Sequence, residues 1–96
     1  MPPKALVLDS KDNVATALCQ LEKGASASVE ISSSIVNVDI LTPIPLGHKF
    51  ALKDIKQGEP ITKYGETIGQ ATMKINKGEH VHVHNVEGLR GRGDRS

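Results

Sequence analysis

The chain is poor in aromatic side chains. Phe50 and Tyr64 are its only aromatic residues, and tryptophan is absent. Many proteins that hold single-stranded nucleic acid stack the bases on aromatic side chains, and this chain lacks such a platform. The core must therefore be built from aliphatic side chains, and the many β-branched residues favour strands.

An excess of charge of either sign is also missing. Twelve basic and eleven acidic residues leave a formal net charge of +1. A balance this close gives no general attraction to nucleic acid or to anionic lipid. We therefore expect neither a nucleic acid nor a membrane as a partner.

Cysteine is nearly absent. Cys19 is the only one, so an internal disulfide is excluded. No signal peptide and no apolar run of membrane-spanning length stand in the sequence, which predicts a cytoplasmic location. No basic residue adjoins Cys19 to stabilise a thiolate, and we interpret it as a small apolar residue at the flank of a helix.

With 96 residues the chain makes one small domain, with one core and little room for a deep pocket. Short apolar runs between glycines and prolines predict strands in residues 4–9, 28–41 and 49–52, the second of them interrupted by a turn at residues 32–34. Extended chain resumes at Ile61, and residues 64–69 predict a tight hairpin. The sequence thus predicts a compact, mainly β fold.

One segment has the spacing of a helix. Apolar residues recur at i, i+3, i+4 and i+7 from Val14 to Leu21. Ser10 or Asp12 would be the N-cap, and Gly24 the left-handed stop. We therefore expect one short helix near the N-terminus.

A short phrase occurs three times, each time with an apolar residue three positions before a glycine that begins a new extended segment. The pairs are Leu21 and Gly24, Ile55 and Gly58, and Ile75 and Gly78. Because the spacings are unequal, the phrase indicates a recurring turn and not a solenoid repeat.

Three histidines stand on alternate residues in the run GEHVHVHN at residues 78–85. In a strand, His80, His82 and His84 would share one face while Val81 and Val83 face the core. Imidazole exchanges protons near neutral pH and is the commonest protein ligand for transition metals. This edge is where we expect chemistry, although a solvated strand face with no function stays open.

A straight strand limits what the three histidines can bind. Same-face neighbours lie roughly 6.5–7 Å apart, so one metal ion takes two of them but hardly all three. His48, the only other histidine, follows a proline-rich bend, and the sequence leaves open whether it lies nearby. Asn85 either ends the strand by bonding nearby backbone or orients a substrate hydroxyl.

The last ten residues differ from the rest. Residues 87–96 hold three arginines and three glycines with almost no apolar side chains. We expect a domain over residues 1–86 and a flexible Gly/Arg tail over 87–96. The guanidinium groups of Arg90 and Arg92 either clamp carboxylates or are simply solvated.

Three motifs together resemble a known family: GEHVHVHNVEGLRGRGD at residues 78–94, IPLGHK at 44–49 and GETIG at 65–69. They are similar to the amino-terminal domain of the altronate and galactarate dehydratases, which also occurs as the small subunit of the sulfolactate sulfo-lyases. The likeness runs from about residue 12 to residue 94.

The resemblance implies a small β-clip domain of the SAF type whose tail leads toward a large catalytic subunit. It also implies a divalent metal, usually iron as Fe2+, at a site shared with that subunit. The site residues it suggests are His82, His84, Asn85, His80 and His48 as catalytic groups, Arg90 and Arg92 for substrate binding, and His82 and His84 as metal ligands.

Three functions follow from this resemblance. The first is a small subunit or domain of an altronate dehydratase-like hydro-lyase, which removes water from an aldonate or aldarate to give a 2-keto-3-deoxy acid and is inactive alone. The second is the small subunit of a (2R)-sulfolactate sulfo-lyase. The third is a non-catalytic binding or assembly module, and a homo-oligomer also stays open.

Overall fold

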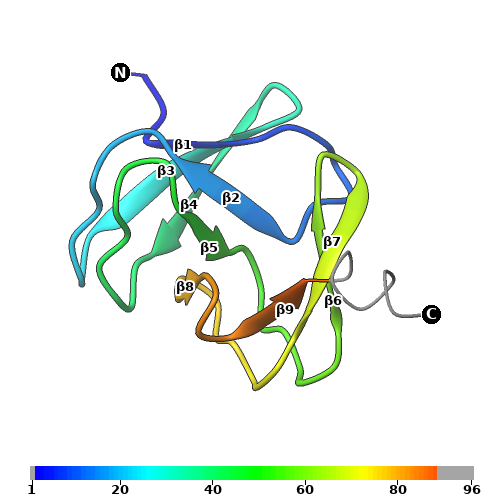
Figure 1. Cartoon of the computed structure of the whole chain (residues 1–96). Helices are drawn as coiled ribbons and strands as arrows, with labels where there is room; N and C mark the ends of the chain where they lie inside the picture. Colours follow the sequence, from blue (N-terminus) through cyan, green and yellow to red (C-terminus); the bar gives the residue numbers. More distant parts are fainter. Residues whose placement is uncertain (1, 89–96) are drawn as a thin grey trace.

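The fold is mainly β, as the sequence predicts. The computed structural model describes residues 2–88, and no helix occurs among them (Figure 1). That stretch accordingly contains no helix capable of crossing a membrane.

Six strands form the larger sheet, in the order β4-β3-β1-β2-β5-β8. In chain order they are β1 Ala5–Val7, β2 Val14–Ala17, β3 Ser26–Ile31, β4 Ser34–Asp39, β5 Lys49–Ala51 and β8 His80–Val81. Strand β1 runs parallel to β3, and the other neighbours in this sheet are antiparallel. The expected strands over residues 4–9, 28–41 and 49–52 are thereby confirmed.

Three strands form a smaller antiparallel sheet, in the order β6-β7-β9. Their bounds are β6 Pro60–Lys63, β7 Glu66–Ala71 and β9 Val86–Gly88. Figure 1 shows this sheet beside the strands β2 and β5 of the larger one. Because β9 ends at Gly88, residues 87 and 88 of the predicted tail pair with β7, and the rest of the tail lies outside the described residues.

The predicted helix near the N-terminus is wrong. Residues 14–17 form β2, which lies between β1 and β5 and pairs with both. Val14, Ala15 and Ala17 are all buried. Ala15 and Ala17 pack in one core cluster and Val14 packs in the other, so both faces of the strand are covered. Leu18, assigned to the buried helix stripe, is 44% exposed. The ladder bonds made with distant strands outweigh the local helical spacing.

The recurring phrase is a turn that the chain uses four times within residues 2–88. In each copy the glycine has φ between 84° and 90°, and the residue after it donates a backbone hydrogen bond to the residue two before it. Positive φ at the third position is typical of a type II turn and favours glycine. The fourth copy, Ile44 to His48, escaped the sequence analysis because its two prolines indicated only an ordered bend.

These turns pair through their apolar residues. Leu21 bridges Ile44, and Ile55 bridges Ile75, in both cases through a reciprocal pair of backbone hydrogen bonds. All four side chains are buried. The turns thus tie the loops between strands into the core and bring His48 to a fixed place beside β5.

The predicted tight hairpin is confirmed between β6 and β7. Tyr64 and Gly65 both have positive φ, 58° and 74°, as a two-residue type I′ turn requires. The carboxylate of Asp12 accepts hydrogen bonds from the backbone N–H groups of both residues, at 3.0 and 2.8 Å. Asp12, expected to cap a helix, instead holds this hairpin to the strand β2.

Two aliphatic clusters make the core. One surrounds Phe50 and is built mainly from strands of the larger sheet, and the other surrounds Ile55, Ile61 and Ile75. Phe50 and these three isoleucines are fully buried. The core is aliphatic except for Phe50, as the shortage of aromatic residues predicts.

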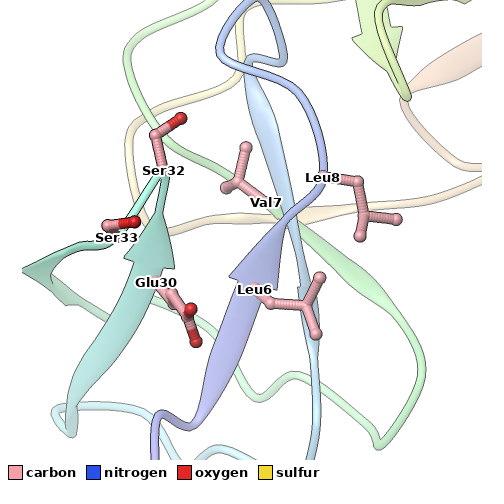
Figure 2. A pocket seen from close by; sticks show the side chains of 6 residues that line it. All are labelled: Leu6, Val7, Leu8, Glu30, Ser32 and Ser33. Carbon is pink, nitrogen blue, oxygen red and sulfur yellow. The ribbon is translucent and has the colours of Figure 1, made fainter.

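A cavity of about 280 Å³ lies at the end of β1 and the turn between β3 and β4 (Figure 2). Its lining residues are Leu6, Val7, Leu8, Glu30, Ser32 and Ser33. Glu30 is the only titratable side chain in that set, so nothing in the lining combines groups for acid and base catalysis.

A glycine pair within the repeated turn tests this account of the fold. Gly78 has φ of 87°, and a Cβ atom there would collide with the backbone carbonyl of Asp39. We expect Gly78→Ala to lower the free energy of unfolding, measured with urea, by at least about 3 kcal/mol. Gly24 has φ of 90° but open space around it, so Gly24→Ala should cost only about 1–2 kcal/mol. Equal losses in the two variants would contradict the packing argument.

Candidate functional site

The histidine run does not stay extended. Strand β8 covers only His80–Val81, and residues 82–85 form a turn in which the N–H of Asn85 donates to the carbonyl of His82 at 3.0 Å. The predicted strand with three histidines on one face is therefore wrong beyond Val81. Val81 is fully buried, as predicted, whereas Val83 is 82% exposed and not part of the core.

Asn85 causes this turn. Its side chain is 1% exposed, its Oδ1 accepts from the N–H of His82 at 2.9 Å, and its Nδ2 donates to the carbonyl of His80 at 2.8 Å. The amide thus bonds backbone on both sides, which is the first of the two roles that the sequence left open. A buried amide held in this way positions the backbone of His80 and His82.

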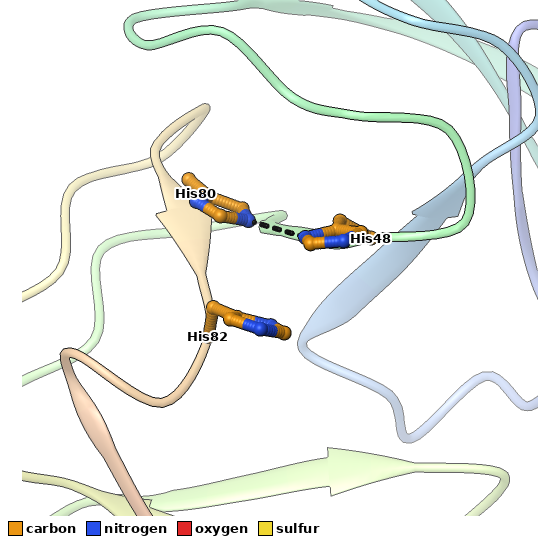
Figure 3. A group of neighbouring side chains, drawn as sticks. All are labelled: His48, His80 and His82. Carbon is orange, nitrogen blue, oxygen red and sulfur yellow. Dashed lines mark hydrogen bonds between the residues drawn. The ribbon is translucent and has the colours of Figure 1, made fainter.

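His48, His80 and His82 form the histidine cluster (Figure 3). His48 comes immediately before β5, and His80 lies in β8, which pairs with β5 in the register Phe50 to His80. The ring of His48 lies 5.1 Å from that of His80 and 4.5 Å from that of His82, centroid to centroid. All three residues are half-buried. The rings of His48 and His80 point toward each other, and the ring of His82 lies alongside them, stacked on both (Figure 3).

One proton joins two of these rings. Nδ1 of His48 and Nε2 of His80 lie 2.9 Å apart, so one nitrogen donates and the other accepts. A metal ion bound by the same two nitrogens would need a lone pair from each and would displace that proton.

His84 lies beside the cluster but is not one of the three histidines whose ring nitrogens lie within 4.8 Å of one another. It is exposed, and its ring centroid lies 5.3 Å from that of His80 at a tilt of 36°. The predicted ligand pair of His82 and His84 is thus not the group that the geometry brings together, while His48, left open by the sequence, is. Arg90 and Arg92, predicted to bind substrate, lie outside the described residues.

The electrostatic environment favours the neutral forms of His80 and His82. Burial, and next the positive charges of neighbouring histidines, lower the pKa of His80 to about 4. Desolvation, with His48 and Lys49, also lowers the pKa of His82. A neutral imidazole has the lone pair that metal binding and proton abstraction both require.

The cluster fits a divalent metal ion. One nitrogen from each of its histidines lies within 4.8 Å of the others. Metal–nitrogen bonds of ~2.0–2.1 Å in tetrahedral geometry place ligand nitrogens about 3.3 Å apart. The rings stack with planes 10° to 27° apart, so they would have to rotate to aim one lone pair each at a common ion. A metal would then bind through His48, His80 and His82.

A cavity of about 160 Å³ opens beside the cluster. It is lined by Lys49, Ile68, His82, Val83 and Val86. The ring of His82 therefore belongs both to the cluster and to a cavity wall. Lys49 belongs to the IPLGHK motif but was not predicted as a site residue. It lines this cavity and is therefore part of the site.

Asn85 gives a direct test of how the histidines are held. Asn85→Ala removes both side-chain hydrogen bonds, and we expect the free energy of unfolding to fall by about 1–3 kcal/mol. The imidazole NMR signals of His80 and His82 should shift at the same time. Asn13 is a matched control, because its side chain bonds the backbone of Pro60 and Thr62 in the same manner. Asn13→Ala should destabilise the fold but leave those imidazole signals in place, and movement of the signals in both variants would contradict the assignment.

The pKa of His80 predicts how stability depends on pH in the metal-free protein. An unfolded histidine titrates near ~6.5, whereas His80 in the fold titrates at about 4. The unfolded state therefore binds more protons between these values, and the free energy of unfolding should fall as pH is lowered from 6.5 to 4. Urea unfolding across this range measures the slope, which His80→Gln should reduce. An unchanged slope in that variant would show that His80 is not the responsible group.

The chain matches a known protein family. Residues 3–89 match the family model described as the altronate/galactarate dehydratase SAF domain. The chain is 39% identical over 80 residues to altronate dehydratase of Bacillus subtilis, and 45% identical over 75 residues to that of Escherichia coli. These matches cover 83% and 78% of this chain but only 15% and 14% of those enzymes.

A second group of relatives is smaller. The chain is 45% identical over 49 residues to the (2R)-sulfolactate sulfo-lyase subunit alpha of Chromohalobacter salexigens, which is 51% of this chain and 52% of that subunit. Since the family model covers nearly the whole sequence, this chain belongs to the altronate/galactarate dehydratase SAF domain family.

Proposed function

We propose that this domain contributes the histidine cluster to the active site of an altronate dehydratase-like hydro-lyase. The reaction removes water from an aldonate or aldarate and gives a 2-keto-3-deoxy acid. The observation that carries this proposal is the convergence of His48, His80 and His82, all half-buried, beside a cavity in a domain of this family.

The domain needs a large catalytic partner, as a separate subunit or in the same polypeptide. A cavity of about 160 Å³ cannot enclose a six-carbon acid and exclude water from it. The altronate dehydratases that this chain matches are several times larger than the matched part. The partner therefore supplies the remaining walls and charged groups.

The histidines suit the proton transfers of the reaction. Elimination needs a base that removes the proton next to the carboxylate and an acid that assists the departing hydroxyl. The ring of His82 lines the cavity and is the group of the cluster placed to reach a bound acid. The proton shared by His48 and His80 lies directly behind it.

We further propose that Fe2+ is the ion held by His48, His80 and His82. When bound, it would act as a Lewis acid that stabilises the departing hydroxyl. A histidine whose lone pair binds metal cannot act as the base, so exposed His84 or a group of the partner would then take the proton. Arg90 and Arg92 stay predicted substrate-binding residues.

A sulfo-lyase is the alternative that a specific observation favours. A segment of 49 residues is 52% of the Chromohalobacter salexigens subunit, which therefore has about 94 residues and is similar in size to this chain. In that case sulfite leaves instead of water. The histidines would still perform the proton transfers, because both reactions remove a proton next to a carboxylate.

Co-expression with a large subunit of the dehydratase family from the same source tests the proposal. We expect the two to co-purify and to convert D-altronate into a 2-keto-3-deoxy acid, measured as product formed over time. His82→Ala should lower the rate by about 10²-fold or more while the pair still co-elutes. Asn37→Ala, on the exposed part of β4, should keep full activity.

Three outcomes would decide against the hydro-lyase. Release of sulfite from (2R)-sulfolactate with no reaction of altronate would assign the alternative. Full activity of His82→Ala would remove the histidine cluster from the chemistry. Co-purification with neither activity would indicate a binding or assembly module.

A further inference from the structure

We propose that Lys49 binds the carboxylate of the substrate in the cavity beside the histidine cluster. This inference rests on the proposed function for the identity of the acid, but not for the binding itself. It holds for a sugar acid and for sulfolactate alike, because both carry a carboxylate next to the carbon that loses its proton.

The cavity lies where the two sheets meet. Lys49 comes from β5 of the larger sheet, Ile68 and Val86 come from β7 and β9 of the smaller one, and His82 and Val83 come from the turn between β8 and β9. Two groups in this lining are polar, the ammonium of Lys49 and the imidazole of His82. A bound group therefore meets apolar walls and the positive charge of Lys49. Such a lining favours an anion with a short carbon chain.

The volume limits what enters. A water molecule occupies about 30 Å³ of liquid, so about 160 Å³ holds a carboxylate and the one or two carbons that follow it. The whole of a sugar acid does not fit. The cavity thus receives one end of the molecule, and the carbon next to the carboxylate then lies on the side of His82.

The charge of Lys49 is not neutralised within residues 2–88. The only ion pair among them joins Lys53 to Glu59. Lys49 is half-buried, and burial, followed by the charge of Lys63, lowers its pKa. The charge that acts on Lys49 is that of Lys63, and Lys49 and His48 in turn act on His80 and His82. A carboxylate from outside would supply the missing negative charge and form a charge-assisted hydrogen bond with the ammonium group.

An NMR titration of the whole chain tests the assignment. The probe is D-gluconate, with D-glucitol as a polyol of the same carbon number without the carboxylate, and sodium chloride as a control for ionic strength. We expect gluconate alone to shift the backbone amide signals of the five cavity residues. We also expect it to shift the Cε signal of Lys49 more than that of Lys63.

Two lysine variants separate contact from long-range attraction. Lys49→Met should weaken gluconate binding by about tenfold or more, because it removes a charged hydrogen-bond donor and keeps the length of the side chain. Lys63→Met removes a nearby charge that does not line the cavity, and should change binding by less than about threefold. Lys49→Arg should retain most of the binding.

Several results would overturn the proposal. One is that D-glucitol or sodium chloride shifts the amide signals as much as gluconate does. A second is that Lys49→Met binds gluconate with an affinity within twofold of the original chain. A third is that gluconate shifts no signal of the cavity residues. If Lys49→Met does not fold, the Cε signals of Lys49 and Lys63 in the original chain decide the matter. Carboxylate binding at Lys49 without turnover of altronate or sulfolactate by the assembled protein would refute the proposed function and leave this inference standing.

Discussion

The pairing of β5 with β8 is the interaction on which the site depends. Two strands of three and two residues, separated by almost thirty residues of chain, lie antiparallel in the register Lys49 to Val81 and Phe50 to His80. Phe50 and Val81 are fully buried and fix this register, since a slip by one residue would turn Val81 outward. Phe50 and Val81 belong to the two different core clusters, and together they hold the pairing from both faces. Because opposite residues of an antiparallel pair share a face, this register places His80 on the side of Phe50 and His48, and so brings the two histidines together.

The histidine cluster and Lys49 form one functional surface. The buried side chain of Asn85 bonds the backbone of His80 and His82, and the type II turn that ends at His48 fixes the backbone of that residue. Within residues 2–88 the groups that act on His80, His82 and Lys49 are neutral or cationic. Such a surface suits a metal ion through its lone pairs and a carboxylate through its lysine. The proposed function rests on this surface, which would present the reacting groups while a larger partner encloses the substrate.

The sequence predicted those parts of the structure that local chemistry determines. The β3–β4 and β6–β7 hairpins, the strands and three of the four type II turns follow from Gly, Ser and β-branched residues close in the chain. The helix over residues 14–21 was wrong because a strand buried on both faces gives the same apolar spacing. The histidine strand was wrong because the side chain of Asn85 bends the backbone. The place of His48 depends on a long-range pairing that no local pattern contains.

The most direct test is the set of imidazole nitrogen chemical shifts during titration of the chain with Zn2+, a diamagnetic substitute for Fe2+. The account predicts that one nitrogen in each of His48, His80 and His82 takes the shift of a metal-bound nitrogen at one equivalent, while His84 does not. Binding by His82 and His84 alone, or by none of the four histidines, would contradict it.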